Sequence, residues 1–268
     1  MATTRIAVIG AAGRMGRAII RAVGEIPSAQ VTAAVERPGA AELGQDAGTL
    51  AGLPPLGVTL QPQVPGAGAA DVWIDFSAPA STVANVQAAR AAGARMVIGT
   101  TGLSSADRQV IVEAAAAVPV VLAPNTSLGV TVLLKLVADA ARALGPGYDI
   151  EVVETHHRMK RDAPSGTALR LAEAAAEGAG RNLAETARYA RHGDVGPRTS
   201  EEIGIQTLRG GDVVGDHTVF FLGLGERIEI THRASSRDTF ARGAVRAALW
   251  LAGRGPGLYD MRDVLGLV

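Results

Sequence analysis

The sequence contains no cysteine, and only two of its 26 basic residues are lysines. Without cysteine the chain forms no disulfide, holds no metal through thiolates and has no cysteine nucleophile, so redox chemistry requires a bound cofactor. The same absence is consistent with a cytoplasmic protein. Arginine supplies the positive charge at the other basic positions. The use of lysine at Lys135 and Lys160 therefore indicates a specific role for one or both side chains.

Net charge and long apolar segments are also missing. Twenty-six acidic residues balance the 26 basic ones, so no overall field attracts nucleic acid or an anionic membrane. No uncharged apolar stretch approaches the ~20 residues that span a bilayer, and the first residues lack the features of a signal or transit peptide. We therefore expect a soluble, cytoplasmic protein that acts on neither nucleic acid nor membrane.

With 268 residues, of which 47% are apolar, the chain is expected to fold as two modest globular domains. In the first half, short β-branched runs alternate with alanine-rich helical runs, which predicts an α/β fold with a doubly wound parallel sheet. After Asn125 the pattern changes to a long helix and strands separated by glycine turns, which predicts an α+β domain with largely antiparallel neighbours. A helix over 235–251, started by serine and aspartate, is predicted to pack back on the first domain. The stretch 38–68 has weak periodicity and is expected to be only partly ordered.

A glycine-rich turn follows the first predicted strand and opens a helix. Its spacing, with Gly10, Gly13 and Gly16 three residues apart, is a variant of the dinucleotide fingerprint. Glycine lets the backbone approach a pyrophosphate, and the helix N-terminus offers unpaired N–H groups. Glu36 ends the second strand, where a carboxylate binds ribose hydroxyls, and Arg37 beside it suits a ribose 2′-phosphate. We therefore predict a nicotinamide cofactor, with use of both NADH and NADPH.

Two further loops leave predicted strands at the carboxyl edge of the sheet, where ligands bind in open α/β folds. They are Gly99-Thr-Thr-Gly102 and Ala123-Pro-Asn-Thr126. Each sequence also fits an ordinary turn. Together with the glycine turn, they are predicted to flank the ribose and the nicotinamide.

The densest chemistry lies in the segment 154–167. Two adjacent histidines, His156 and His157, lack the helical spacing of a metal pair, so no metal site is predicted. A histidine titrates near neutral pH and Lys160 can donate a proton where arginine cannot, which favours acid–base chemistry. The sequence Pro164-Ser-Gly-Thr opens the next predicted helix, and its backbone N–H groups suit a carboxylate, so the substrate is predicted to be an anion. A solvated basic loop before a capped helix is the simpler alternative.

Long ordered motifs run from one end of the chain to the other. They are GAAGRMG at Gly10, GTTG at Gly99, HHRMKRDAPSGTAL at His156, GGDVVGDHTVFF at Gly210, ITHRASSRDTFARGAVRAALWL at Ile230 and GLYDMRDVL at Gly257. Together they resemble the 4-hydroxy-tetrahydrodipicolinate reductase (dihydrodipicolinate reductase) family.

The resemblance implies NAD(P)H-dependent reduction of 4-hydroxy-tetrahydrodipicolinate, a cyclic dicarboxylate, to tetrahydrodipicolinate in lysine and diaminopimelate biosynthesis. It implies a Rossmann-type dinucleotide-binding domain of residues 1–126 plus 236–268. Into this domain is inserted an α+β domain of residues 127–235, which binds the substrate and forms a homotetramer.

Site roles follow from matching positions. The resemblance implies that His156 is the catalytic proton donor/acceptor, that Lys160 is the second proton donor and that His157, Gly166 and Thr167 contact the substrate carboxylates. It also implies that nucleotide is bound by Gly10, Ala11, Ala12, Gly13, Arg14, Met15, Glu36, Arg37, Gly99, Thr100, Thr101, Ala123, Pro124, Asn125 and Thr126. Two positions depart from the usual pattern: Met159 replaces a common third histidine, and Thr126 replaces a phenylalanine that is frequent beside the nicotinamide.

Two other functions remain open at this point. One is a different two-domain NAD(P)-dependent dehydrogenase, acting for example on an amino acid, and the other is a non-catalytic NAD(P)-sensing protein. The block from His156 to Thr167 disfavours both. Among residues given no catalytic role, Arg209 is predicted to lie in a turn and His217 to be a structural histidine.

Overall fold

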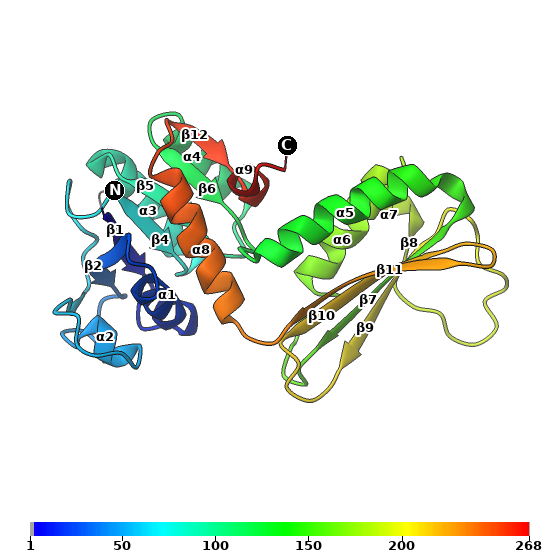
Figure 1. Ribbon diagram of the computed structural model, residues 1–268, viewed down its shortest axis with the longest axis horizontal. Coiled ribbons are helices and arrows are strands. Elements are labelled where there is room, and N and C mark those ends of the chain that lie inside the picture. The colour runs from blue at the N-terminus through cyan, green and yellow to red at the C-terminus, as the bar shows by residue number, and fades with distance from the viewer. Residues whose placement is uncertain (1–2, 268) are drawn as a thin grey trace. The chain divides into compact units, whose positions relative to one another are not determined.

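A computed structural model describes residues 3–267, and its contacts divide the chain into two units (Figure 1). Unit 1 comprises residues 1–128 and 237–268, and unit 2 comprises residues 129–236. The chain thus leaves unit 1, builds unit 2 and then returns to complete unit 1. Within residues 3–267, no helix is both long and apolar enough to cross a membrane.

Unit 1 contains a parallel sheet of seven strands in the order β12-β6-β5-β4-β1-β2-β3, which confirms the predicted doubly wound α/β fold. The order reverses at β1, which lies between β2 and β4, and such a switch point opens a crevice at the carboxyl ends of the strands. The strands are β1 (Thr4–Ile9), β2 (Ala29–Val35), β3 (Leu60–Gln61), β4 (Val72–Asp75), β5 (Arg95–Ile98), β6 (Pro119–Leu122) and β12 (Gly257–Tyr259).

Helices cover both faces of this sheet. One face packs against α1 (Arg14–Gly24) and α8 (Asp238–Leu251), and the other against α3 (Pro79–Ala92) and α4 (Ser105–Ala115). Short helices α2 (Ala47–Leu50) and α9 (Met261–Leu265) complete the unit.

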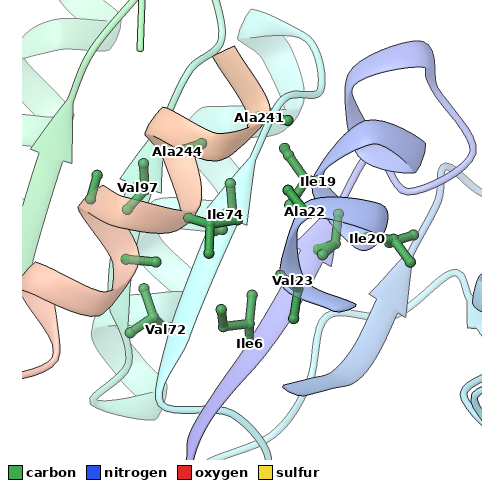
Figure 2. Packing of buried hydrophobic residues seen from close by; sticks show 14 of the residues in the cluster. Ile6, Ile19, Ile20, Ala22, Val23, Val72, Ile74, Val97, Ala241 and Ala244 are labelled. Atoms are coloured by element: carbon green, nitrogen blue, oxygen red, sulfur yellow. The ribbon is translucent and has the colours of Figure 1, made fainter. Parts of the chain in front are cut away.

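The core beneath α1 and α8 joins residues from both ends of the chain. Figure 2 shows Ile19 on α1 and Ala241 and Ala244 on α8 around Ile74 of the sheet. All four are buried. The alanines give α8 a small-residue face that lies close to its neighbours, so the return of the chain from unit 2 fills the core of unit 1.

Several short elements differ from the sequence prediction. The stretch 38–68 contributes α2 and the two-residue edge strand β3, and β12 joins the opposite edge. Runs of two or three residues carry no readable period, so pattern does not reveal them. The last long helix begins at Asp238 with Arg237 as its N-cap, later than predicted, because the preceding strand continues to Ala234.

Unit 2 is a five-stranded sheet in the order β11-β10-β7-β9-β8, packed against helices. Its elements are α5 (Leu128–Leu144), β7 (Asp149–His156), α6 (Gly166–Gly178), α7 (Leu183–Thr186), β8 (Ala187–Arg188), β9 (Ile203–Arg209), β10 (Gly215–Leu222) and β11 (Arg227–Ala234). A 3₁₀ turn at Gly145–Gly147 links α5 to β7.

The prediction of a largely antiparallel sheet in unit 2 is correct only in part, because the sheet is mixed. Strand β10 pairs antiparallel with β7 and β11, but β9 pairs parallel with both β7 and β8. The reason is the connection from β7 to β9, which contains α6 and α7. Such a helical crossover returns the chain to the starting end of the sheet, whereas a short turn reverses it.

The two faces of this sheet differ in character. Val152 and Phe221 point to the face that packs against the helices and are fully buried. The opposite face carries Thr218, Phe220 and Leu222, of which Leu222 is exposed. This second face is called the open face below.

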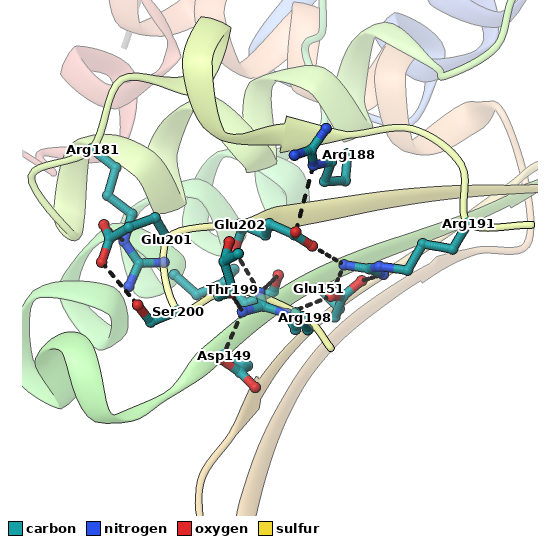
Figure 3. Close-up of polar contacts among 11 residues, drawn as sticks. Asp149, Glu151, Arg181, Arg188, Arg191, Arg198, Thr199, Ser200, Glu201 and Glu202 are labelled. Carbon is teal, nitrogen blue, oxygen red and sulfur yellow. Dashed lines mark hydrogen bonds and ion pairs between the residues drawn. The ribbon is translucent and has the colours of Figure 1, made fainter. Parts of the chain in front are cut away.

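Arginine–carboxylate pairs fasten the segment 189–202 to the start of β7 (Figure 3). Arg198 donates from Nη1 to Asp149 Oδ1 at 2.6 Å and from Nε to Glu151 Oε1 at 3.1 Å. Arg191 donates from Nη2 to Glu151 Oε1 at 2.9 Å and to Glu202 Oε2 at 3.0 Å. These contacts order a segment that has little regular secondary structure.

Candidate active site

Unit 1 carries a first cavity of about 450 Å³ at the carboxyl ends of β1 and β2. Its lining includes the turn residues Gly10, Ala12 and Gly13 and the pair Glu36 and Arg37. The predicted pyrophosphate turn and the predicted ribose-binding carboxylate therefore lie on one cavity.

A second cavity of about 390 Å³ lies beside the ends of β4, β5 and β6. Phe76 and Ser77, which follow β4, line both cavities. The predicted nucleotide residues on its wall are Arg14, Met15, Gly99, Thr100, Thr101, Pro124, Asn125 and Thr126.

The glycine turn is shaped by close backbone approach. Gly10 has φ of +79°, and a Cβ there would lie 2.7 Å from the carbonyl oxygen of Phe76. A Cβ on Gly16 would lie 2.2 Å from the Gly10 carbonyl oxygen. Side chains are thus excluded where helix α1 meets the sheet, and the first turn of α1 faces the site with its N–H groups. These features fit a dinucleotide pyrophosphate.

Glu36 is held in place by backbone donors. The N–H of Ala12 donates to its Oε2 and the N–H of Arg37 to its Oε1, each at 3.0 Å. The carboxylate is fixed against the glycine turn, while the Arg37 side chain is exposed. A carboxylate so placed fits the adenosine ribose hydroxyls of a nicotinamide dinucleotide.

Buried polar contacts set the loops around the second cavity. Asp75 is fully buried at the end of β4; its Oδ1 accepts from the Ser77 N–H at 2.8 Å and its Oδ2 from Asn85 Nδ2 at 3.2 Å. The Phe76 ring lies where a Cβ on Gly99 would project, 2.1 Å from it, so glycine at 99 makes room for the aromatic ring.

Thr126 is 1% exposed. Its hydroxyl donates to the carbonyl oxygen of Phe240 on α8 at 2.6 Å. A Cβ on Gly243 would lie 1.8 Å from the Thr126 carbonyl oxygen, so α8 packs directly on this loop. Thr126 therefore connects the cavity wall to α8.

Two predicted nucleotide residues, Ala11 and Ala123, line neither cavity and are buried in the core beneath α1 and α8. Sequence reasoning overlooked Phe76 and Ser77, although they follow a strand at the same edge as the loops that it selected. It also overlooked Arg237 and Phe240 on the second cavity, for which no local pattern gives a signal.

In unit 2, the side chain of Glu154 is at the centre of a buried polar cluster. It is 0% exposed, and both of its oxygens accept hydrogen bonds. Oε2 lies 2.6 Å from His156 Nδ1 and 2.8 Å from Arg209 Nη1. Oε1 accepts from Arg209 Nη2 at 2.9 Å, from the Ser165 N–H at 3.0 Å and from Thr207 Oγ1 at 3.2 Å. The cluster gathers residues from β7, β9 and the start of α6.

One expectation for this region, that for Arg209, needs correction. Arg209 is the last residue of strand β9 and binds the buried Glu154, whereas the sequence placed it in a turn. His217 is 4% exposed, and its Nε2 lies 3.0 Å from Ser165 Oγ. Its ring meets that of His156 edge to face, with 5.2 Å between centroids, so this structural histidine borders the candidate catalytic one.

Lys160 lies in the loop between β7 and α6. Its Nζ donates to both oxygens of Asp162, at 2.9 and 2.8 Å. The backbone carbonyl of Asp162 in turn accepts from Arg209 Nη2 at 2.6 Å. Arg209 therefore links the loop that carries Lys160 to the carboxylate that binds His156.

The remaining predicted substrate residues lie at the two ends of the same loop. The N–H of His157 donates to the carbonyl oxygen of Val213 at 2.8 Å, which ties the loop to the β9–β10 connection. Ser165 caps α6 through its Oγ, which accepts from the Ala168 N–H at 3.1 Å. Gly166 and Thr167 form the first turn of α6, whose N-terminus favours an anion.

The cluster shifts the pKa values of its members. Burial raises the pKa of Glu154, but hydrogen bonds from Arg209 and His156 outweigh it, and the net pKa is below the usual range. Burial lowers the pKa of His156; Glu154 opposes this shift and the charge of Lys160 adds to it. Burial, followed by the charge of His156, lowers the pKa of His217 to about 4. At neutral pH the cluster thus holds an ionised Glu154 and a neutral His217.

This arrangement is suited to proton transfer to an anion. It combines a histidine, a lysine and a helix N-terminus on one loop. Across residues 3–267, no group of three or more histidine, aspartate or glutamate side chains is arranged to hold a metal ion.

Two family models match the chain. Residues 4–126 match the model described as dihydrodipicolinate reductase, N-terminus, and residues 129–265 match the model described as dihydrodipicolinate reductase, C-terminus.

Curated relatives agree over nearly the whole length. The chain is 58% identical over 265 residues to a 4-hydroxy-tetrahydrodipicolinate reductase of Anaeromyxobacter dehalogenans (strain 2CP-1), covering 98% of both chains. It is 56% identical over 266 residues to the protein of the same name in Alkalilimnicola ehrlichii, covering 99% of this chain and 100% of the relative.

Among solved structures, the chain resembles the dipicolinate-bound dihydrodipicolinate reductase from Paenisporosarcina sp. TG-14 with a TM-score of 0.72. The match covers 97% of this chain and 98% of the other, at 21% sequence identity. At that identity the likeness supports the fold.

Proposed function

Because this chain belongs to the dihydrodipicolinate reductase family, we propose that His156 and Lys160 transfer the protons of its reaction. The chain is a nicotinamide-dependent oxidoreductase that reduces 4-hydroxy-tetrahydrodipicolinate to tetrahydrodipicolinate in lysine and diaminopimelate biosynthesis. The single observation that carries the proposal is the buried contact of Glu154 with His156, next to the loop of Lys160 and the N-terminus of α6.

The bound cofactor supplies a hydride, and the protein supplies orientation, charge and protons. Replacing a hydroxyl group by hydrogen releases one water molecule, so one proton must reach the departing oxygen. We assign its delivery to His156 Nε2, at the end of β7, and to Lys160 Nζ in the loop that follows. Arginine, abundant around them, holds its proton and serves for charge alone.

We assign the substrate carboxylates to His157, Gly166 and Thr167. The first turn of α6 offers backbone N–H donors and the positive end of the helix dipole, which is the environment that a carboxylate prefers. Gly166 is exposed and adds no side chain, which leaves space for the anion to approach the backbone. A cyclic dicarboxylate would be oriented by this turn.

For the cofactor we propose that both NADH and NADPH are used. Glu36 is fixed by backbone N–H groups where it can accept from the ribose hydroxyls of NADH. Arg37 is exposed at the same cavity and can pair with the 2′-phosphate of NADPH. Michaelis constants for the two cofactors within one order of magnitude would support dual use. Values several orders apart would contradict it.

We also propose that the enzyme is a homotetramer assembled through the open face of the unit 2 sheet. On that face, Leu222 is 36% exposed two residues from Phe220 on β10, and Leu208, paired with Thr155, is 50% exposed farther along the sheet. Exposed apolar patches on a sheet mark interaction surfaces, and symmetric copies of one face bury each other. Light scattering should give four times the mass of the chain, and Phe220→Glu should reduce it.

We place the enzyme in the cytoplasm, with a small molecule as its substrate and neither nucleic acid nor membrane as a partner. The balanced charge and the absence of cysteine support this location.

The decisive experiment supplies the substrate enzymatically. Purified protein is added to dihydrodipicolinate synthase with pyruvate and aspartate semialdehyde, and nicotinamide absorbance is followed with NADH and with NADPH. Oxidation that depends on both the protein and the synthase is expected. If neither cofactor is oxidised while the synthase is active, the assignment is wrong.

A further inference from the structure

We propose that Glu154 and Arg209 are positioning residues that hold the His156 imidazole with its proton on Nδ1, so that Nε2 is the atom that exchanges a proton with the substrate. This inference rests on the proton-transfer role proposed above for His156. It concerns two buried side chains that lie behind the candidate catalytic group.

The first support is the hydrogen-bond inventory of Glu154. Apart from His156, each group that contacts the Glu154 carboxylate donates to it: the guanidinium of Arg209, the N–H of Ser165 and the hydroxyl of Thr207. An ionised carboxylate can only accept, and the contact of Oε2 with His156 Nδ1 is short, at 2.6 Å. Nδ1 must therefore carry a proton, and in neutral His156 the lone pair lies on Nε2.

The second support is the space around Nε2. A Cβ on Gly215 would lie 3.0 Å from His156 Nε2, so glycine at this position keeps the working nitrogen clear of a side chain. The His156 side chain is 11% exposed, and the bond to Glu154 fixes the ring while Nε2 faces away from that carboxylate. Nδ1 of the His156 ring is thus bonded to Glu154, and Nε2 is the ring nitrogen that can exchange a proton with the substrate.

The third support is the charge of Arg209. A bare carboxylate beside histidine stabilises the charged imidazolium and raises its pKa, but here Arg209 bonds to both oxygens of that carboxylate. The charged or titratable groups that face His156 are Glu154 on its own strand, Arg209 on β9, Lys160 in the following loop and His217 on β10. Arg209 therefore lets Glu154 orient the ring without making the proton on Nε2 hard to release.

Arg209 also reaches the second candidate catalytic group. Its Nη2 donates to the Asp162 carbonyl oxygen, and the Asp162 carboxylate binds Lys160 Nζ. One guanidinium thus fixes the position of His156 through Glu154 and of Lys160 through the loop backbone.

The variant Glu154→Gln tests the assignment of the proton because an amide has only one acceptor oxygen. Three groups donate to Oε1 of Glu154: the Ser165 N–H, the Thr207 hydroxyl and Arg209 Nη2. Oε2 is contacted by His156 Nδ1 and Arg209 Nη1. The amide oxygen is therefore expected at the Oε1 position. Its NH₂ group would then donate to His156 Nδ1 and move the histidine proton to Nε2.

The primary measurement is nitrogen NMR of the imidazole rings in protein labelled with ¹⁵N-histidine, at a pH where His156 is neutral. Comparison with His156→Asn assigns the His156 signals. We expect the unprotonated nitrogen to be Nε2 in the parent protein and Nδ1 in Glu154→Gln. The same tautomer in both proteins would overturn the proposal.

The control is Glu151→Gln, on the same strand. Glu151 also binds arginines, Arg191 and Arg198, but it points to the open face and does not touch His156. Its substitution should leave the His156 signals in place. A buried arginine without its partner can prevent folding, so Glu154→Gln is also made together with Arg209→Met. In that double variant Ser165 and Thr207 still donate to the amide oxygen. His156 is again expected to carry its proton on Nε2.

The pH dependence of kcat is the second measurement. It tests the proton-transfer role of His156 separately from the positioning role of Glu154 and Arg209. Arg209→Met should raise the pKa of His156 and Glu154→Gln should lower it, so the pH profiles of kcat should move in opposite directions. Glu154→Gln should also reduce kcat by about 10²-fold, the scale of general acid–base catalysis, with KM for the nucleotide unchanged. Changed NMR signals with an unchanged kcat profile would contradict the role of His156, and unchanged signals would contradict the positioning.

Discussion

The two units build their sites from different materials. In unit 1 the cavities are bounded by glycines, backbone amides and loop ends, and the Glu36 carboxylate is held by main-chain N–H groups. In unit 2 the site rests on side chains, with Glu154, His156 and Arg209 bonded to one another in a buried cluster. The proposed nucleotide site therefore depends on backbone shape, and the proposed proton-transfer site depends on buried charge.

This difference predicts different responses to substitution. A site shaped by the backbone should lose ligand affinity when a methyl group is added. Its affinity should change little with pH, because few titrating groups line the site. A charge cluster tolerates small changes of volume but responds to protonation and to the loss of either partner.

The largest effect is expected for Lys160→Ala. Removing a proton donor should lower kcat by about 10³-fold, within the usual range for general acid–base groups. Nucleotide affinity, measured by titration calorimetry, should be unchanged because the proposed nucleotide site lies in unit 1. Lys135→Ala is the matched control, since Lys135 is the only other lysine and pairs with Asp139 on the outside of α5. Collapse of nucleotide binding in Lys160→Ala would show that the two sites are not separate.

The next effect concerns acid stability. The folded pKa of His217 is about 4, below its ordinary 6.5, so the unfolded chain binds more protons between these values. The free energy of unfolding should then fall by roughly 3 kcal/mol as pH drops from about 6.5 to about 4. His217→Gln should remove this decrease in the free energy of unfolding between about pH 6.5 and about pH 4. Substitution of the exposed His192 should leave the decrease in place.

Spectroscopy can assign the acid sensitivity to one unit. Both tryptophans, Trp73 and Trp250, lie in unit 1. On acidification, circular dichroism should therefore change before tryptophan fluorescence does. Simultaneous transitions, or fluorescence changing first, would mean that the acid-labile part is not confined to unit 2.

A smaller effect is expected for Gly10→Ala. The new Cβ would lie 2.7 Å from the Phe76 carbonyl oxygen at a residue with φ of +79°. The methyl group would displace the turn, and restoring the binding geometry would cost about 3 kcal/mol of strain. This cost should weaken nucleotide binding by about 10²-fold. Gly57→Ala is the matched control, because Gly57 has φ of +73° but nothing within 4 Å of the new methyl group. It should lower stability by about 1–2 kcal/mol and leave nucleotide affinity unchanged. Equal effects on affinity would show that close approach is not what shapes the site.

The smallest effect is expected for Arg37→Ala. Loss of a phosphate-pairing cation should raise KM for NADPH by about tenfold and leave KM for NADH nearly unchanged. Arg108→Ala, an exposed arginine on α4, serves as the control. An equal change for both cofactors would mean that Arg37 does not contact the 2′-phosphate.

The same contrast explains what the sequence could predict. Strand and helix periods and the spacing from Gly10 to Gly16 are local signals, and the doubly wound sheet of unit 1 follows from them. Two- and three-residue edge strands such as β3 and β12 have no period to read. The parallel pairing of β7 with β9 depends on how the chain crosses between them, which composition does not reveal.

For the candidate site, local sequence selected His156, Lys160 and the start of α6 because they lie on one short segment. It assigned Arg209 to a turn, since the partner of Arg209, Glu154, is 55 positions away. A bond between residues so distant becomes visible only when β7 and β9 are paired. Residues that touch the ligand can thus be proposed from motifs, whereas those that hold them require the fold.

The return of the chain to unit 1 has a consequence for synthesis. Helix α8 supplies Ala241, Ala244 and their neighbours to the core around Ile19 and Ile74. A ribosome that builds the chain from its N-terminus completes residues 129–236 before α8 exists. Unit 2 can therefore fold first, while the nascent sheet of unit 1 has an uncovered apolar face that chaperones can bind. A circular permutant that begins at residue 237 would deliver α8 at the start of translation and remove that delay.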